Sequence, residues 1–284
     1  MASNLGCVGM DIDGHDDLGA LIDRVMPAAA SMGDAGGVTA WRWTDASGAR
    51  LTFGIKDHAL EDLVPSYAGE PGVHLSGMTL IGPEIVAADV LDADGELTTR
   101  LACDLEQWRS LGSEPAAGTA AVTALGVAVS VHADETAYQS SPQSLLDPDG
   151  GDHERPLRMA TESFVSYGLF AVGQEADAHA RLSGVVLSSA TLVNGCTGQD
   201  FHVARVGCLG MEIDVCVPAP EHPAGLWPGN VVAGTCYLVA SVEALWPGSE
   251  PVPVPGSAEE KRRLRWSAAE PARTTSYVAG ARDA

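Results

Sequence analysis

Residues 181–242, RLSGVVLSSATLVNGCTGQDFHVARVGCLGMEIDVCVPAPEHPAGLWPGNVVAGTCYLVASV, carry the pattern that decides the fold. Residues 182–186 form an apolar run interrupted by Gly184. A glycine inside a strand indicates a bulge, a bend or a close backbone approach. The Asn-Gly and Thr-Gly pairs of residues 194–198 then supply the backbone freedom that tight turns require. The stretch therefore begins as a strand and a turn.

Three further segments complete this stretch. Residues 201–206 and 213–217 place apolar side chains with a partial period of two, which predicts strands. Residues 218–229 contain four prolines and two glycines, so we expect a loop there. Residues 231–242 predict a last pair of strands, or one long bent strand, around Gly234. Together these segments predict a small closed β-barrel.

The order of these segments resembles that of the OB fold, a five-stranded Greek-key barrel. A strand with an early glycine, a hairpin, a third strand, a long connection and a last strand follow one another, with a Pro-rich loop where many OB folds have a helix. The resemblance implies binding of oligonucleotides or oligosaccharides. Another small barrel or a sandwich remains open, because short strands with regular turns fit both.

The segment at residues 73–131 repeats this order upstream. Its HLSG sequence matches the RLSG sequence of the stretch above, and an Asp-Ala-Asp-Gly hairpin turn follows at residues 92–95. Three pairs of segments correspond: residues 74–77 with 181–184, residues 118–122 with 229–233, and residues 125–131 with 236–242. We therefore predict a tandem duplication.

The predicted fold class is mostly β, with a small α+β N-terminal unit and two OB-like Greek-key barrels in tandem. Five segments follow from the patterns: an α+β unit at residues 1–64, a first OB-like barrel at 65–132, a flexible linker at 133–160, a second OB-like barrel at 161–247, and a Pro-rich, partly basic, disordered tail at 248–284.

The N-terminal unit is expected to contain a strand, a helix and a hairpin. Residues 5–12 are a candidate strand. Residues 16–26 place apolar side chains on one face of a helix, with two aspartates in its first turn. Residues 38–43 and 49–55 flank a turn sequence and predict a hairpin.

The composition limits the classes of function. The net charge of −22 repels phosphate backbones and anionic membranes, so we expect neither a nucleic-acid partner nor a membrane partner. Uninterrupted apolar runs stay short of a transmembrane helix, and the acidic N-terminus does not resemble a signal peptide. A cytoplasmic location is predicted. Arginine in place of lysine, with much alanine, glycine and valine, is typical of GC-rich bacterial genomes.

The six cysteines are expected to be reduced and structural. The chain is not small, has no Cys-x-x-Cys pair, and places most of its cysteines in apolar runs, where a thiol acts as a small hydrophobic group. A zinc site formed by His202, Cys208 and Cys216 across adjacent strands is a further hypothesis.

The candidate metal-binding residues are Asp11, Asp13 and His15, in the sequence Met-Asp-Ile-Asp-Gly-His. Asp-x-Asp-Gly after an apolar run resembles the nucleophile motif of haloacid-dehalogenase-type phosphatases, in which the first carboxylate attacks phosphorus and the pair holds Mg²⁺. His15 stands where that family has threonine. Asp13 as a helix N-cap is the alternative interpretation.

These observations favour a non-catalytic binding or scaffold protein for a protein partner or a small ligand, with no cofactor and with homodimer formation through exposed sheet edges. One alternative is an enzyme with an acidic site, dependent on a divalent cation, near Asp11, Asp13 and His15. A second alternative is an OB-type nucleic-acid binder, which the net charge disfavours.

A thermal-shift screen against divalent metals, nucleotides, sugars and phosphorylated metabolites separates these classes. The enzyme alternative predicts a stabilising shift with one class of compound, since ligands that bind only the folded state raise its stability. Asp11→Asn or Asp13→Asn should then abolish the shift. A shift that survives both substitutions would exclude these two aspartates from the site.

Overall fold

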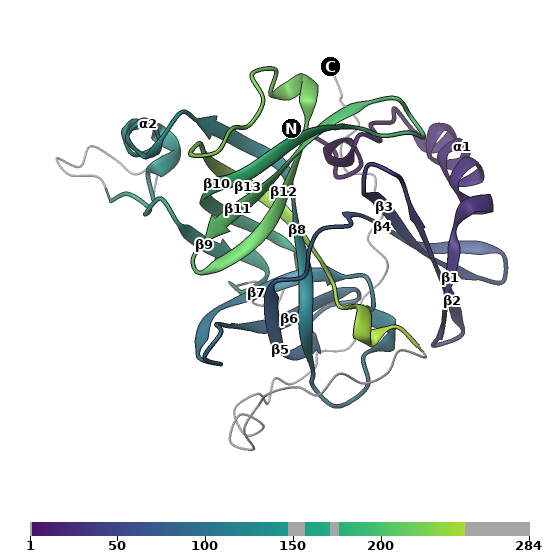
Figure 1. Cartoon of the computed structure of the whole chain (residues 1–284). Helices are drawn as coiled ribbons and strands as arrows, with labels where there is room; N and C mark the ends of the chain where they lie inside the picture. Colours follow the sequence, from purple (N-terminus) through teal and green to yellow (C-terminus); the bar gives the residue numbers. More distant parts are fainter. Residues whose placement is uncertain (1, 147–156, 171–175, 248–284) are drawn as a thin grey trace.

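The computed structural model describes residues 2–146, 157–170 and 176–247, and its strands form two sheets (Figure 1). The four-stranded sheet contains β1 (Ala30–Ala35), β2 (Val38–Thr44), β3 (Ala49–Lys56) and β4 (Ala59–Tyr67). The nine-stranded sheet contains β5 (Val73–Leu80), β6 (Ile85–Leu91), β7 (Leu97–Leu105), β8 (Ala116–His132), β9 (Ser163–Ser166), β10 (His179–Val193), β11 (Asp200–Cys208), β12 (Met211–Pro218) and β13 (Val231–Ser241). The predicted mostly β fold class is confirmed.

Helices are few and short in the described residues. The α-helices are α1 (His15–Val25) and α2 (Glu135–Ser140). The 3-10 turns are η1 (Gly6–Val8), η2 (Met26–Ala28), η3 (Trp108–Ser110), η4 (Pro142–Ser144), η5 (Tyr167–Phe170), η6 (Ala219–Glu221) and η7 (Glu243–Leu245). No helix among the described residues is long and apolar enough to cross a membrane.

The nine-stranded sheet closes into two rings that share the strands β8 and β13. The first ring runs β5-β6-β7-β13-β8 and returns to β5. The second ring runs β10-β11-β12-β8-β13 and returns to β10. In each ring one pair is parallel, β7 with β13 and β12 with β8, and the other pairs are antiparallel. Figure 1 shows β8 running from the group of β5, β6 and β7 toward the second ring.

Each of the two shared strands pairs with strands of both rings. The first part of β8 pairs with β5, with Ala120 opposite Val73, and its middle pairs with β12. The first part of β13 pairs with β10, with Val231 opposite Val185, and its end pairs with β7. β8 is the fourth strand of the first repeat and also serves as the fifth strand of the second ring. β13 is the fourth strand of the second repeat and also serves as the fifth strand of the first ring. Because pairing across a hundred residues leaves no local pattern, the sequence predicted consecutive barrels and not this exchange.

The strand register corrects the predicted alignment of the repeats. Gly118 lies opposite Leu75, and Gly234 lies opposite Leu182. Since the HLSG and RLSG segments correspond, Gly118 is equivalent to Gly234 and not to Gly229. The predicted match of residues 118–122 with 229–233 is therefore wrong by five positions, 234 minus 229, and the match of 125–131 with 236–242 shifts with it.

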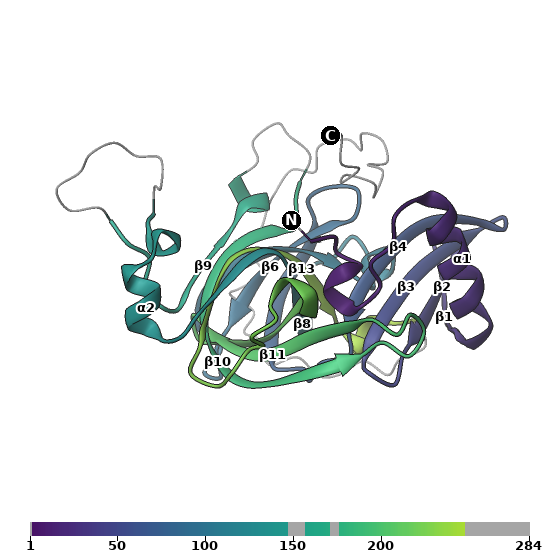
Figure 2. The ribbon, with the colours of Figure 1, turned by 90° about the horizontal axis from the view of Figure 1, so that it is seen from above.

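Two large apolar clusters hold the fold together. The interiors of both rings form one continuous cluster, to which β11 contributes Ala204 and Val206. The alternate side chains of β11, Phe201 and Val203, point outward and join a second cluster with η1, α1 and the four-stranded sheet. Figure 2 shows this sheet, with α1 beside it, on the side of the molecule away from α2. The sheet thus packs on the outside of the rings.

Several local predictions are confirmed and others are wrong. Helix α1 and the hairpin β2–β3 lie where the sequence predicted them. The strand predicted at residues 5–12 is absent from the described structure, because η1 and Gly9, with a φ of 69°, turn the chain there. Asp13 is not the N-cap of α1, which is Gly14 without a side-chain cap.

The segment predicted as a flexible linker is structured in part. Within residues 133–160, Asp134 caps α2 by accepting a hydrogen bond from the Ala137 N–H at 2.8 Å, and Tyr138 is fully buried. The remainder of the linker at 147–156, and the predicted disordered tail at 248–284, lie outside the described residues.

Gly234 offers a test of the shared ribbon of β8 and β13. A Cβ at this position, where φ is 151°, would lie 2.2 Å from the Ala128 carbonyl oxygen. We expect Gly234→Ala to lower the free energy of unfolding by at least about 2 kcal/mol, because backbone atoms must move to admit the methyl group. Denaturant unfolding measures the change.

Gly19→Ala is the matched control. Gly19 lies on α1 with open space around it, so alanine should raise stability by about 0.5–1 kcal/mol. Equal stabilities of Gly234→Ala and the wild-type protein would contradict the close approach of β13 to β8.

Candidate functional site

The residues predicted to bind a metal lie in the segment between η1 and α1. Asp11 and Asp13 are exposed. The Asp11 N–H donates to Gln199 Oε1 at 2.7 Å, and Gln199 Nε2 donates back to the Asp11 carbonyl oxygen at 2.8 Å. The Ser3 hydroxyl donates to Asp11 Oδ1 at 3.1 Å. The backbone of Asp11 therefore ties the N-terminal segment to the turn before β11.

No metal cluster is assembled among the described side chains. In that part of the chain, no three histidine, cysteine or acidic side chains converge in an arrangement that could hold a metal ion. The His15 side chain lies outside the described set, so the site of Asp11, Asp13 and His15 stays a prediction.

The hypothetical zinc ligands lie apart. His202 shares a hydrogen bond of 2.9 Å with the Thr191 hydroxyl and donates from Nε2 to the His222 carbonyl oxygen at 3.0 Å. Cys208 belongs to the apolar interior of the rings, whereas Cys216 belongs to the outer cluster.

Five of the six cysteines are buried, among them the four that the sequence places in apolar runs. All six are unpaired, and only Cys196 is more than marginally exposed. Burial raises the pKa of the Cys208 thiol to about 12, and burial raises the thiol pKa of four others well above its usual value: Cys7, Cys103, Cys216 and Cys236. Because the thiolate is the reactive form, these five thiols are poor nucleophiles.

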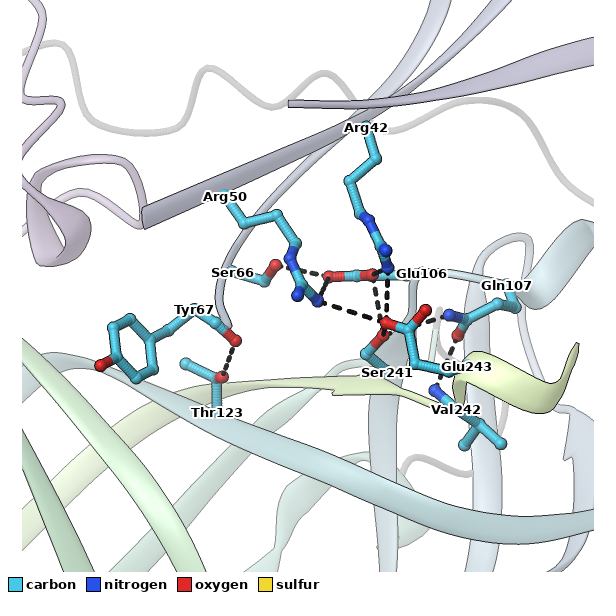
Figure 3. Close-up of polar contacts among 10 residues, drawn as sticks. All are labelled: Arg42, Arg50, Ser66, Tyr67, Glu106, Gln107, Thr123, Ser241, Val242 and Glu243. Carbon is cyan, nitrogen blue, oxygen red and sulfur yellow. Dashed lines mark hydrogen bonds and ion pairs between the residues drawn. The ribbon is translucent and has the colours of Figure 1, made fainter. Parts of the chain in front are cut away.

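The most concentrated polar chemistry of the described chain surrounds Glu106, and sequence reasoning did not find it (Figure 3). Glu106 follows the end of β7, and its side chain is fully buried. Arg42 of β2 and Arg50 of β3 approach it from one face of the four-stranded sheet. We call this set, with Glu243, Ser66 and Ser241, the Glu106 network.

Two hydroxyl groups donate directly to the Glu106 carboxylate. The Ser66 hydroxyl donates to Oε1 at 2.5 Å, and the Ser241 hydroxyl donates to Oε2 at 2.9 Å. The guanidinium groups lie slightly farther away, with Arg50 Nη1 at 3.5 Å from Oε1 and Arg42 Nη1 at 3.7 Å from Oε2. Ionised and hydrogen-bonded partners on every side compensate the desolvation of this carboxylate.

Glu243 balances the second positive charge. Its Oε1 lies 2.5 Å from Arg42 Nη1 and 3.7 Å from Arg50 Nη1, and half of its side chain is exposed. Two arginines and two glutamates therefore make a neutral cluster. The arginines belong to the four-stranded sheet, whereas Glu106 and Glu243 follow the ends of β7 and β13 in the first ring. The cluster therefore fixes how the sheet is oriented on the ring.

A narrow cleft adjoins the Glu106 network. Asp62 Oδ2 accepts hydrogen bonds from Trp108 Nε1 at 3.3 Å and from Arg109 Nε at 3.1 Å, which closes one end. The indole of Trp246 forms part of the wall. The cavity inside the cleft measures about 20 Å³, far below the roughly 300 Å³ of typical small-molecule pockets.

The chain matches no protein-family model, no curated protein and no solved structure. The site is therefore interpreted from its own geometry. A signal for it was present in the sequence, because Glu106 ends an apolar run and Arg42 interrupts another. What the sequence lacks is any sign that residues so far apart in the chain meet.

Substitution of Glu106 tests the role of the network. We expect Glu106→Gln to lower the free energy of unfolding by about 3 kcal/mol, because it leaves buried guanidinium charge against a neutral amide. Glu243→Gln, at the exposed side of the same cluster, should cost less than about 1 kcal/mol. Similar losses for both variants in denaturant unfolding would contradict the central position of Glu106.

Proposed function

We propose that this protein is a non-catalytic binding protein that serves as a scaffold for a protein partner. The observation that carries the proposal is the open edge of the four-stranded sheet. Strand β1 pairs with β2 alone among the described strands, and all six of its residues are exposed or half-buried. An open edge presents unpaired backbone N–H and C=O groups, to which an extended segment of a partner can add as a further strand.

The two rings support a scaffold role through their OB-like order. In each ring the first strand pairs with the second and fourth, and the third runs parallel to the fifth, as in OB folds. These folds bind oligonucleotides on the face of their second and third strands. Here Phe201, Val203 and Cys216 on that face of the second ring pack against η1, within the outer cluster. The chain itself covers the surface that an OB-type ligand would use.

The corresponding face of the first ring is covered in part, at Ala102. The Ser166 hydroxyl of β9 accepts a hydrogen bond from the Ala102 N–H of β7 at 2.8 Å. A Cβ added to Gly168 of η5 would lie 2.8 Å from the Ala102 methyl group, so η5 also rests on this face. Together with the net charge of −22, this coverage argues against nucleic acid as the partner.

Binding of a partner strand fits the other features of the chain. The five buried thiols and Glu106 serve the fold, and the cleft beside the Glu106 network is too small for a metabolite. A larger hollow of about 340 Å³, lined by Arg24, Trp43 and Cys196, lies wide open to solvent. The acidic surface favours a basic partner whose affinity falls with salt. Six unpaired cysteines suit a reducing compartment, so the proposal places the protein in the cytoplasm. A second copy of the chain, pairing through its own β1, is the alternative occupant.

Hydrogen exchange on complexes isolated from native extract tests the proposal. Peptides that cover Ala30–Ala35 should gain protection in the complex relative to the isolated protein, because their outward N–H groups become paired. Peptides from the central strand β3 (Ala49–Lys56) are the control and should not change. Unchanged exchange at β1, or a small-molecule thermal shift without any protein partner, would contradict the proposal.

A further inference from the structure

Two buried polar atoms beside the Glu106 network have no partner among the described residues. They are the hydroxyl oxygen of Thr52 and the indole nitrogen of Trp246. Thr52 is 4% exposed and Trp246 is 5% exposed, so bulk water does not satisfy them. A buried hydroxyl or N–H without a hydrogen bond is costly, and native structures seldom tolerate it.

Both residues line the same enclosed cleft. Thr52 lies on β3 opposite Arg42, on the sheet face that meets the network. The Arg42 guanidinium also packs over the Trp246 ring, with its central carbon 5.7 Å from the ring centroid. The cavity of about 20 Å³ exceeds the roughly 10–15 Å³ that one water molecule requires.

We propose that this cleft binds one ordered water molecule that joins the Thr52 hydroxyl to the Trp246 indole. The water oxygen accepts from Trp246 Nε1–H, which is a donor only, and the Thr52 hydroxyl donates or accepts as needed. Glu106 also lines the cleft, and its carboxylate has acceptor capacity for the remaining water hydrogen. The water then extends the Glu106 network to the edge of the first ring.

A hydrated cavity and a dry cavity predict opposite changes in the melting temperature of the Thr52→Val variant. If the cavity is hydrated, Thr52→Val removes a partner of the bound water and lowers the melting temperature. If the cavity is dry, the same substitution removes an unsatisfied hydroxyl and raises the melting temperature. Valine keeps the shape of threonine, so the comparison isolates the hydroxyl group.

The experiment is calorimetry of Thr52→Val, with Thr44→Val as the control. Thr44 is exposed at the end of β2, so its substitution should leave the melting temperature unchanged. We expect Thr52→Val to lower it by about 2–4 °C, the shift typical of a change near 1 kcal/mol in a chain of this size. A melting temperature that rises or does not change would overturn the proposal.

Two further measurements locate the effect. In a Trp246→Phe background the loss caused by Thr52→Val should shrink, because the indole no longer holds the water; strict additivity would overturn the bridge. A high-resolution crystal structure should show density within about 3.2 Å of both atoms, the reach of a hydrogen bond. An empty cleft in that map would overturn the proposal.

Discussion

The structure depends on the antiparallel ribbon of β8 and β13. The two strands pair from Val231 opposite His132 to Ser241 opposite Ala121, and every other strand of the two rings attaches to this ribbon directly or through one neighbour. The physical constraint is that buried backbone N–H and C=O groups must be paired. The four strands of one repeat do not close a ring here, so each repeat leaves an edge that the extended fourth strand of the other repeat fills. Because each half completes the other, the shared ribbon makes the two rings one unit with a continuous apolar interior.

A second constraint fixes the four-stranded sheet on the rings. The outer apolar cluster supplies most of the contact on one face of this sheet, and apolar contact alone is not directional. The Glu106 network on the other face is directional, since Glu106 must lie between Ser66, Ser241 and two guanidinium groups. A buried ionic cluster adds little net stability, whereas loss of one member is costly. We therefore interpret the network as a device that specifies orientation. The proposed water extends the same logic to two further buried polar atoms of the seam, the Thr52 hydroxyl oxygen and the Trp246 indole nitrogen.

The sequence predicted those parts of the fold that leave a local pattern. The amphipathic spacing of α1, the alternation of β11 and β12 and the Asp-Gly turn between β6 and β7 were each sufficient for a correct assignment. Strands β1 and β4 were missed, because ASMGDA has no β-branched residue and β4 carries Pro65, which suits the sheet edge where it lies. The Glu106 network could not be predicted, since its members are brought together by pairing between distant strands. For the same reason the exchange of β8 and β13 left no trace in the order of the segments.

Native-state hydrogen exchange tests the shared ribbon most directly. If β8 and β13 complete both rings, neither ring can open alone, and the slowest amides of β6 and β11 should report the same opening free energy over a range of denaturant. That free energy should equal the global value from equilibrium unfolding. Two distinct opening free energies, with the amides of one ring exchanging while the other ring stays protected, would contradict the exchange of strands on which the account rests.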